Sequence, residues 1–299
     1  MLDGFTCVPG IRIGHAHDAA ALSGVTLIVP DAPVVMAVDV RGGGPGTRET
    51  DALDPSALIE RVHGLALAGG SVFGLAAADE LALCLSAAGI GLDIGAGLPR
   101  VPVIPAAILF DLGNGGDKNW RGDPPYRRLA RDAFAALGRD DPSGPVGAGH
   151  GARAGSRRGG IGSTGARLSS GHHIGALVAV NSFGEAYEGA PPEGAVPMPK
   201  LRARAAAMDA SAVDGVGNTC IGAIATDAPL TRVQARRVAM MAHDGLARAI
   251  RPIHTPFDGD SLFVMSTATE GTSDNVAIAE IGTIAADLVA RAVRKAVFD

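Results

Sequence analysis

The sequence predicts a single α/β domain in which layered sheets are covered by helices. Its 299 residues suffice for one large domain or two ordinary ones. Strand-like and helix-like segments alternate along it, and no boundary in the second half separates two independent cores. Apolar residues make up 47% of the chain but aromatic residues only 4%. We therefore expect one single domain over residues 1–299, with a core of Ala, Val, Leu and Ile.

Short runs rich in β-branched residues predict the strands. The run at 101–112 is bracketed by prolines, so that strand should lie at a sheet edge or start late. The run at 172–189 is the clearest case, because Ile174, Ala176, Val178 and Val180 share one face. The other expected strands lie at 24–30, 33–43, 220–228 and 261–271.

Apolar residues at spacings of three and four predict the helices. Residues 55–89 are expected to be helical, broken at Gly69-Gly70, with a second helix from about Ser71 to Ala88. Amphipathic helices are expected at 124–137, at 230–250 with Thr231 as N-cap, and at 277–297. The Gly/Ser-rich stretch at 140–171 is either a flexible linker or part of the fold, since it leads directly into a strong strand. Residues 194–217 are expected to form a surface loop.

Charge and cysteine content exclude several classes of protein. The formal net charge is −5 with acids and bases interleaved, so neither nucleic acid nor a membrane surface is an expected partner. The N-terminal stretch lacks the pattern of a secretion signal. Three scattered cysteines do not suggest disulfides or a metal site. The expected location is the cytoplasm.

The stretch GVGNTCIGAIATDAPLT, residues 215–231, holds the candidate catalytic centre. Asn218 precedes Thr219 at the mouth of a strand. If the bend strains that peptide bond, the Thr219 hydroxyl can attack the Asn218 carbonyl, and water can cleave the resulting ester. The freed amine, with a reference pKa of ~7.7–8.0, would then be a base beside its own hydroxyl. A β-branched residue that merely opens a strand is the alternative.

Three further side chains complete this candidate site. Asp258 and Asp260, in the run HTPFDGDSLF, could hold a new ammonium or orient the hydroxyl. Asn181, at the end of an apolar strand, could donate its amide N–H to an oxyanion. Its alternative role is that of a turn residue. Cys220 is the better nucleophile chemically, but as the second residue of the strand it should face the opposite way.

These residues lie within blocks that resemble the self-processing L-aminopeptidase D-esterase/amidase family, whose relatives include β-peptidyl aminopeptidase and the nylon-oligomer endo-hydrolase. The resemblance runs nearly the whole length of the chain, in order. The blocks that carry it are PGIRIGHAHD, VDVRGGGPGTRETD, LAGGSVFGLAAADE, VPVIPAAILFDLG, VGAGHGARAG, GALVAVNSFG, GNTCIGAIATDAPLT and MAHDGLARAIRPIHTPFDGDSLF.

The resemblance implies a four-layer αββα sandwich, similar to N-terminal-nucleophile hydrolases but with its own connectivity. It implies self-cleavage between Asn218 and Thr219 into pieces 1–218 and 219–299, and association as a homotetramer without cofactor or metal. Thr219 falls on the nucleophile and Asn181 on the oxyanion-positioning asparagine. Asp258 and Asp260 fall on the pair that supports the nucleophile and its amine. The glycines of residues 42–46 would let backbone pass close to the site.

One position departs from the family pattern, and two other functions stay open. Ser156 stands where the nylon-hydrolase branch has a lysine, so the role of that lysine is unassigned here. The expected activity is hydrolysis of small peptides or amides, with a free amino end preferred, since no basic pocket for an acidic acyl group is evident from the sequence. The alternatives are an acyltransferase of the glutamate N-acetyltransferase type, whose cleavage site reads differently, and an uncut non-enzymatic scaffold.

Overall fold

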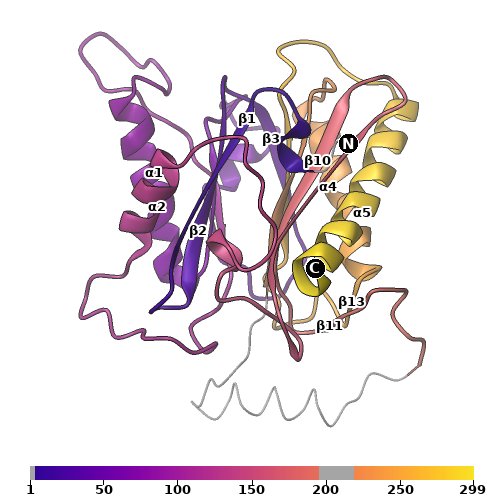
Figure 1. Ribbon diagram of the computed structural model, residues 1–299. Coiled ribbons are helices and arrows are strands. Elements are labelled where there is room, and N and C mark those ends of the chain that lie inside the picture. The colour runs from indigo at the N-terminus through magenta and orange to yellow at the C-terminus, as the bar shows by residue number, and fades with distance from the viewer. Residues whose placement is uncertain (1–3, 195–218) are drawn as a thin grey trace.

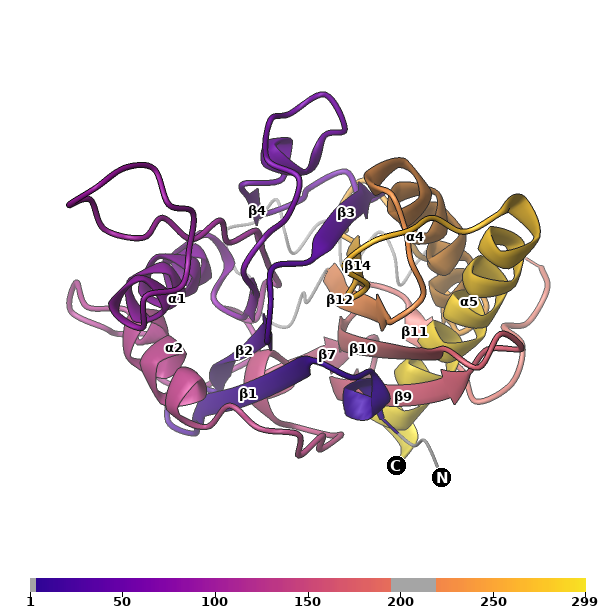
Figure 2. The same ribbon diagram turned by 90° about the horizontal axis from the view of Figure 1, so that it is seen from above.

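The computed structural model describes residues 4–194 and 219–299. In that part of the chain, two five-stranded sheets lie face to face, and a pair of helices covers the outer face of each (Figures 1 and 2). Seen from above, the order is helices, sheet, sheet, helices. This is the four-layer αββα arrangement that the family resemblance implies.

The first sheet is formed by the N-terminal half of the chain and has the strand order β1-β2-β5-β6-β4. Its strands are antiparallel except for β5 and β6, which run parallel. Helices α1 (Ala76–Ala87) and α2 (Tyr126–Ala135) cover it. The strands are β1 (Ile11–Asp18), β2 (Ser23–Pro30), β4 (Thr47–Arg48), β5 (Leu65–Ala68) and β6 (Ala106–Ile108).

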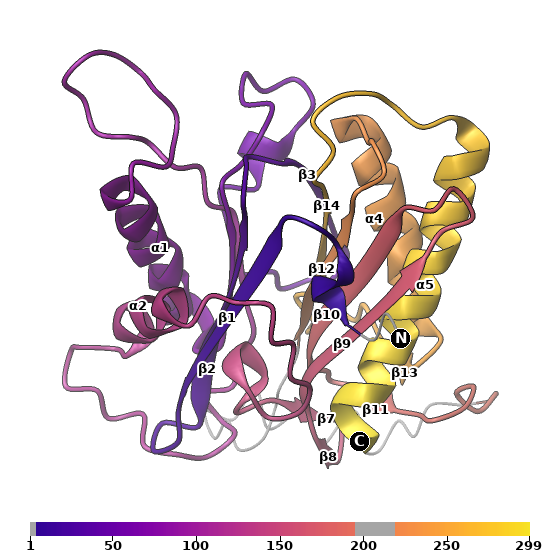
Figure 3. The same ribbon diagram turned by 45° about the horizontal axis from the view of Figure 1, so that its top comes forward.

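The second sheet carries the candidate site and has the order β3-β14-β12-β10-β9. Strands β12 and β14 are parallel, and the other neighbours are antiparallel. Helices α4 (Arg232–Ala247) and α5 (Asn275–Phe298) cover its outer face (Figure 3). The strands are β3 (Val35–Val40), β9 (Gly160–Arg167), β10 (His173–Asn181), β12 (Thr219–Thr226) and β14 (Ser261–Ser266).

Short elements connect these layers. Two small ribbons pair β7 (Arg153–Ala154) with β8 (Arg157–Arg158) and β11 (Glu185–Ala186) with β13 (Ile250–Arg251). The 3-10 turns are η1 (Phe5–Cys7), η2 (Asp51–Leu53), η3 (Ser71–Leu75) and η4 (Gly147–Gly149).

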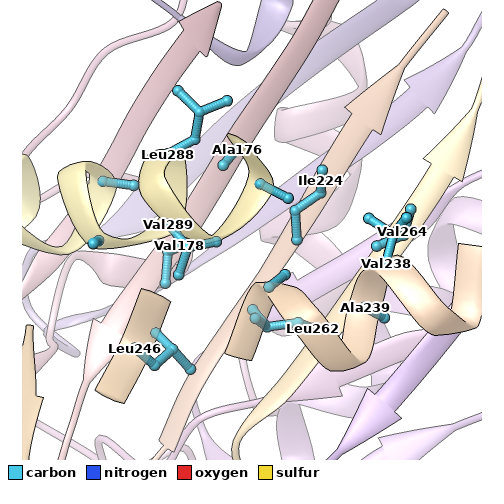
Figure 4. Close-up of a cluster of buried hydrophobic side chains, with 14 of the residues drawn as sticks. Ala176, Val178, Ile224, Val238, Ala239, Leu246, Leu262, Val264, Leu288 and Val289 are labelled. Carbon is cyan, nitrogen blue, oxygen red and sulfur yellow. The ribbon is translucent and has the colours of Figure 1, made fainter. Parts of the chain in front are cut away.

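Three hydrophobic clusters hold the layers together, one at each interface. The cluster between the sheets includes Phe5, Leu67 and Phe263. The cluster under α1 and α2 includes Leu81 and Tyr126. The cluster under α4 and α5 is built from small and branched aliphatic side chains of both helices and of β10, β12 and β14 (Figure 4). Central strands of such a sandwich are buried on both faces, which explains why every residue of β12 is buried.

Most of the expected elements are confirmed. Strands form in each of the six predicted runs, and α2, α4 and α5 match the predicted helices. Thr231 caps α4 as expected: its hydroxyl accepts from the Gln234 N–H, and the Gln234 side chain accepts from the Thr231 N–H. The three cysteines are free. The expected loop at 194–217 lies, but for Gly194, outside the described residues.

One expectation is wrong, and two alternatives that the sequence left open are settled. The helix expected over 55–68 is absent, because Leu65–Ala68 is a fully buried strand between β2 and β6; sheet pairing overrides the helix propensity of Leu and Ala. Strand β6 is interior, not an edge, although it does start late, after Pro105. Residues 140–171 are not a linker, since they contain β9, which lies at the edge of the second sheet next to α5.

Glycine lets α4 and α5 approach each other closely, and this predicts a stability effect. A Cβ at Gly245 would lie 2.2 Å from the carbonyl oxygen of Ala286. Gly245→Ala should therefore lower the free energy of unfolding, because overpacking costs ~1–3 kcal/mol and outweighs a helix-propensity gain of at most ~1 kcal/mol. Chemical denaturation measures the change.

Gly282→Ala is the matched control on the facing helix. The three nearest atoms to a Cβ at Gly282 all belong to the Met241 side chain, which can move aside. Its loss of stability should be smaller. Equal stability of Gly245→Ala and the unmodified protein would contradict the close approach.

Candidate active site

Thr219 begins β12 and is paired with Asn181, the last residue of β10. Residues directly opposite on antiparallel strands have Cβ atoms ~4.5–5.5 Å apart on the same face. Thr219 shares its face with Ile221 and Ala223, which belong to the cluster between the sheets. Its side chain therefore points toward the inner space of the sandwich, and the residue is only 4% exposed.

A glycine lies against the Thr219 hydroxyl. A Cβ at Gly259 would lie 3.0 Å from Thr219 Oγ1 and 2.8 Å from the carbonyl oxygen of Gly44. The glycine run at 42–44 packs against the same turn: the Arg41 N–H donates to the Asp260 carbonyl over 2.9 Å and the Gly44 N–H to the Asp258 carbonyl over 2.8 Å. The backbone of residues 41–44 thus packs against the turn that lies at the Thr219 hydroxyl, as the family resemblance implied.

Asp260 is fully buried and its carboxylate is held by three donors. Its Oδ1 accepts from the backbone N–H of Cys220 over 2.7 Å. Its Oδ2 accepts from the His254 backbone N–H over 3.1 Å and lies 2.8 Å from His254 Nδ1. The carboxylate therefore lies next to the peptide group that follows Thr219.

Asp258, on the other side of Gly259, is also fully buried. Its Oδ2 accepts from the backbone N–H and the hydroxyl of Thr255, over 2.7 and 2.6 Å. Burial, with a further contribution from the Asp260 charge, raises the pKa of Asp258 from 3.8 to about 6, against the opposite effect of these hydrogen bonds. One of the two carboxyls can thus hold a proton in mildly acidic solution.

Asn181 is fully buried and its amide is oriented by neighbours on both sides. Its Nδ2 donates to the Phe110 carbonyl over 2.9 Å. Its Oδ1 accepts from the Arg153 backbone N–H over 2.9 Å and from Asn114 Nδ2 over 3.2 Å. An amide nitrogen has two hydrogens, so this fixed group keeps a second N–H to donate.

Cys220 faces away from this site. Its side chain lies in the cluster beneath α4 and α5, as the strand alternation predicted. Burial, and then the charges of Asp260 and Asp258, raise the pKa of its thiol well above the ordinary value. A buried thiol that resists ionisation is a poor nucleophile, so the geometry favours Thr219 over its neighbour.

The structure brings the described candidates together and adds partners that the sequence analysis missed. Thr219, Asn181, Asp258 and Asp260 converge on the start of β12, whereas Asn218 lies outside the described residues. His254 and Thr255, missed earlier, hold the two carboxylates. Both residues lie in the same short run, 254–260, as the two aspartates, and this closeness in sequence could have identified them.

Asn114 and Ser156 lie in loops near the site. Asn114 positions Asn181 from a distant loop, and no local pattern marked it. Ser156, which stands at the family lysine position, is in the turn between β7 and β8, where its N–H and hydroxyl both donate to Glu185 Oε2 over 2.9 Å. Across residues 4–194 and 219–299, no group of three or more His, Cys, Asp or Glu is arranged to hold a metal ion. No helix in the same ranges is long and apolar enough to cross a membrane.

Comparisons with known proteins place this arrangement among amide hydrolases. The model of peptidase family S58 matches residues 3–299. A Mycobacterium tuberculosis protein named an uncharacterized aminopeptidase is 39% identical over 324 aligned positions, covering 98% of this chain and 92% of its own. A 6-aminohexanoate-oligomer endohydrolase of Paenarthrobacter ureafaciens is 30% identical, covering 96% of this chain and 84% of its own.

Solved structures agree on the fold. A β-aminopeptidase of Burkholderia sp. superposes with a TM-score of 0.74 at 23% identity, over 99% of this chain and 86% of its own. The L-aminopeptidase D-Ala-esterase/amidase of Ochrobactrum anthropi, described as a variant of the Ntn hydrolase fold, gives a TM-score of 0.73 at 20% identity, over 99% and 85%. The chain therefore has an Ntn-hydrolase-type fold.

The raised pKa of Asp258 predicts how stability depends on pH. The folded state binds this proton more tightly than the unfolded state, so the stabilisation is complete below about pH 3.8 and is lost as the pH rises through about 6. The loss attributable to Asp258 is at most ~3 kcal/mol. Denaturation between pH 4 and 7 should show this decline, and Asp258→Asn should flatten it.

The exposed variant Asp123→Asn controls for the loss of one carboxylate at the surface. The stability of this variant should still decline between pH 4 and 7. An identical pH dependence in Asp258→Asn and the unmodified protein would show that Asp258 ionises normally.

Proposed function

Because the chain belongs to peptidase family S58, we propose that it is a self-processing hydrolase in which Thr219 becomes the N-terminal nucleophile. Membership makes it an enzyme that hydrolyses peptide or amide bonds, and it disfavours the acyltransferase and scaffold alternatives. The observation that supports the threonine assignment is the place of Thr219: its hydroxyl lies against Gly259, which separates the buried Asp258 and Asp260 in sequence, and the residue is paired with Asn181.

Maturation would start with attack of Thr219 Oγ on the Asn218 carbonyl. The C–O bond forms, the C–N bond breaks, and the nitrogen takes the hydroxyl proton, which gives an ester. Water then hydrolyses the ester and leaves residues 1–218 with a new carboxylate and residues 219–299 with a new amine. Asp258 and Asp260 are close enough to residue 220 to act on its thiol electrostatically, and they are proposed to hold this amine as an ammonium.

Turnover would use the same hydroxyl with the free amine as base. The amine takes the hydroxyl proton while Oγ attacks the substrate carbonyl, and the oxyanion accepts the second N–H of Asn181 Nδ2. The proton then passes to the leaving amine, and water hydrolyses the acyl-threonine ester. An N-terminal amine has a reference pKa of ~7.7–8.0, so a useful fraction is unprotonated near neutral pH.

The substrate class and the assembly belong to the same proposal. Small peptides or amides with a free amino end fit a site flanked by carboxylates, and they agree with the names of the relatives. A homotetramer in the cytoplasm is proposed from the family resemblance. The domain is proposed to be single, cut into two associated pieces.

Self-cleavage predicts two pieces in mature protein. The second should begin Thr-Cys-Ile-Gly by N-terminal sequencing, and denaturing mass spectrometry should find pieces 1–218 and 219–299. Thr219→Ala should stay a folded, inactive single chain, because alanine has no hydroxyl. Cys220→Ala should be cut normally and serves as the neighbouring control. Active protein whose mass is wholly that of the intact chain would overturn the proposal.

The oxyanion role predicts a selective loss of turnover. Asn181→Ala should lower kcat by ~10²–10³-fold with a smaller change in KM, because the donor acts in the transition state. Asp260→Ala should also impair turnover. Steady-state kinetics on a small amino-acid anilide measure both, with Asn119→Ala, an exposed amide, as control. An unchanged kcat in folded Asn181→Ala protein would remove Asn181 from the mechanism.

A further inference from the structure

A cavity of about 350 Å³ opens beside the candidate site, next to residues that hydrogen-bond to Asn181. It is lined by Leu22, Asn114, His150, Gly151, Ala152, Arg153 and Arg158. Its volume lies at the lower end of the range for small-ligand pockets, roughly 300–1,000 Å³. The cavity can therefore hold a small polar group but not a long chain.

Two lining residues connect the cavity directly to Asn181. The Arg153 backbone N–H and Asn114 Nδ2 both donate to Asn181 Oδ1, over 2.9 and 3.2 Å. Asn114 Nδ2 also donates to the Gly151 carbonyl over 2.7 Å, so its amide orientation is fixed. A molecule whose carbonyl meets the free N–H of Asn181 would have one end within reach of this cavity.

The cavity carries positive charge. Arg153 and Arg158 are opposite each other in the β7–β8 ribbon, and both are exposed. Within residues 4–194 and 219–299, neither guanidinium has an ion-pair partner, and the one side-chain hydrogen bond of Arg158 is donated to the His150 carbonyl over 3.5 Å. Guanidinium groups bind carboxylates through two parallel hydrogen bonds.

Two acidic groups lie near the cavity: Asp111 behind its wall, and Glu185, which accepts from Ser156 in the turn of the same ribbon. The Oδ2 of Asp111 lies behind Gly151, 3.2 Å from where a Cβ would be. Asp111 is fully buried, and burial raises its pKa, which favours its neutral form. No carboxylate is among the residues that line the cavity.

We propose that this cavity binds a carboxylate of the substrate, with Arg158 as the main anchor and Arg153 beside it. The proposal rests on the proposed amide hydrolysis and names its substrate class: short molecules that carry an anionic group near the scissile amide. It differs from the expectation drawn from the sequence, where nothing indicated a basic pocket for an acidic acyl group. The carboxylate can come from the free C-terminus of the leaving part or from an acidic side chain of the acyl part.

Two substrate pairs distinguish these sources in the mature, full-length protein. The first compares Ala-Ala with Ala-Ala-amide, which differ only in the terminal carboxylate. The second compares Glu-p-nitroanilide with Gln-p-nitroanilide, which differ in the side chain. In one of the pairs, the anionic member should have a kcat/KM higher by roughly ten- to a hundred-fold, the range expected for a hydrogen bond to a charged group.

Arg158→Gln should abolish most of that preference, mainly through a higher KM for the anionic substrate. Arg158→Lys should restore part of it, since the charge returns without the paired donors. Arg157→Gln is the matched control, because Arg157 lies over the Phe298 ring and does not line the cavity; it should keep the preference.

The outcomes separate the two proposals. Hydrolysis in both pairs without preference for the anionic member, or a preference that survives in Arg158→Gln, would overturn the carboxylate pocket and leave the hydrolase intact. Failure of mature protein to hydrolyse any of the four substrates, together with an uncut chain, would overturn the proposed function itself.

Discussion

The pairing of β10 with β12 determines where every part of the site lies. It sets Asn181, the last residue of β10, opposite Thr219, the first residue of β12. The parallel neighbour β14 begins at Ser261, paired with Ile221, so the turn before it delivers Asp258 and Asp260 to the same end. A slip of one residue in either pairing would send Thr219 into the helical core and expose the thiol of Cys220 instead.

That register places two carboxylates out of water, which is unfavourable unless donors compensate. Asp260 receives three, from Cys220 and His254, while Asp258 receives two from Thr255. Burial, with a further contribution from the Asp260 charge, raises the pKa of Asp258 in spite of its hydrogen bonds. The His254 ring also contacts His243, with centroids 4.9 Å apart, and His243 Nε2 lies 2.9 Å from the Asp39 carbonyl. The support of the site thus extends into α4 and β3.

Most elements of the fold could be predicted from the sequence, because the strands buried in the sandwich are long, contiguous apolar runs. The apolar composition of runs such as 172–181 and 219–226 predicts strands, and the family resemblance predicted the order of the layers. The composition of Leu65–Ala68 did not, since Leu and Ala favour helices and only pairing with two neighbours makes them a strand. Strand β9 was hidden by its glycines, which are needed because a Cβ at Gly162 would lie 1.8 Å from the Ala292 carbonyl. The candidate site residues came from short motifs, whereas Asn114 comes from a loop with no motif of its own.

The basic cavity could not be predicted from the sequence, because three arginines in a glycine-rich run are typical of a solvated surface. Only the pairing of β7 with β8 brings two of them next to each other. Once folded, the surroundings of Asn181 are polarised. The buried carboxylates of Asp258 and Asp260 lie near Thr219, and the guanidinium groups of Arg153 and Arg158 line the neighbouring cavity. A short peptide with free ends is itself polarised, with an ammonium at one end and a carboxylate at the other. With the proposed function and the proposed carboxylate site, small zwitterionic substrates would match these charges better than long or end-blocked chains, which would place neutral groups against both.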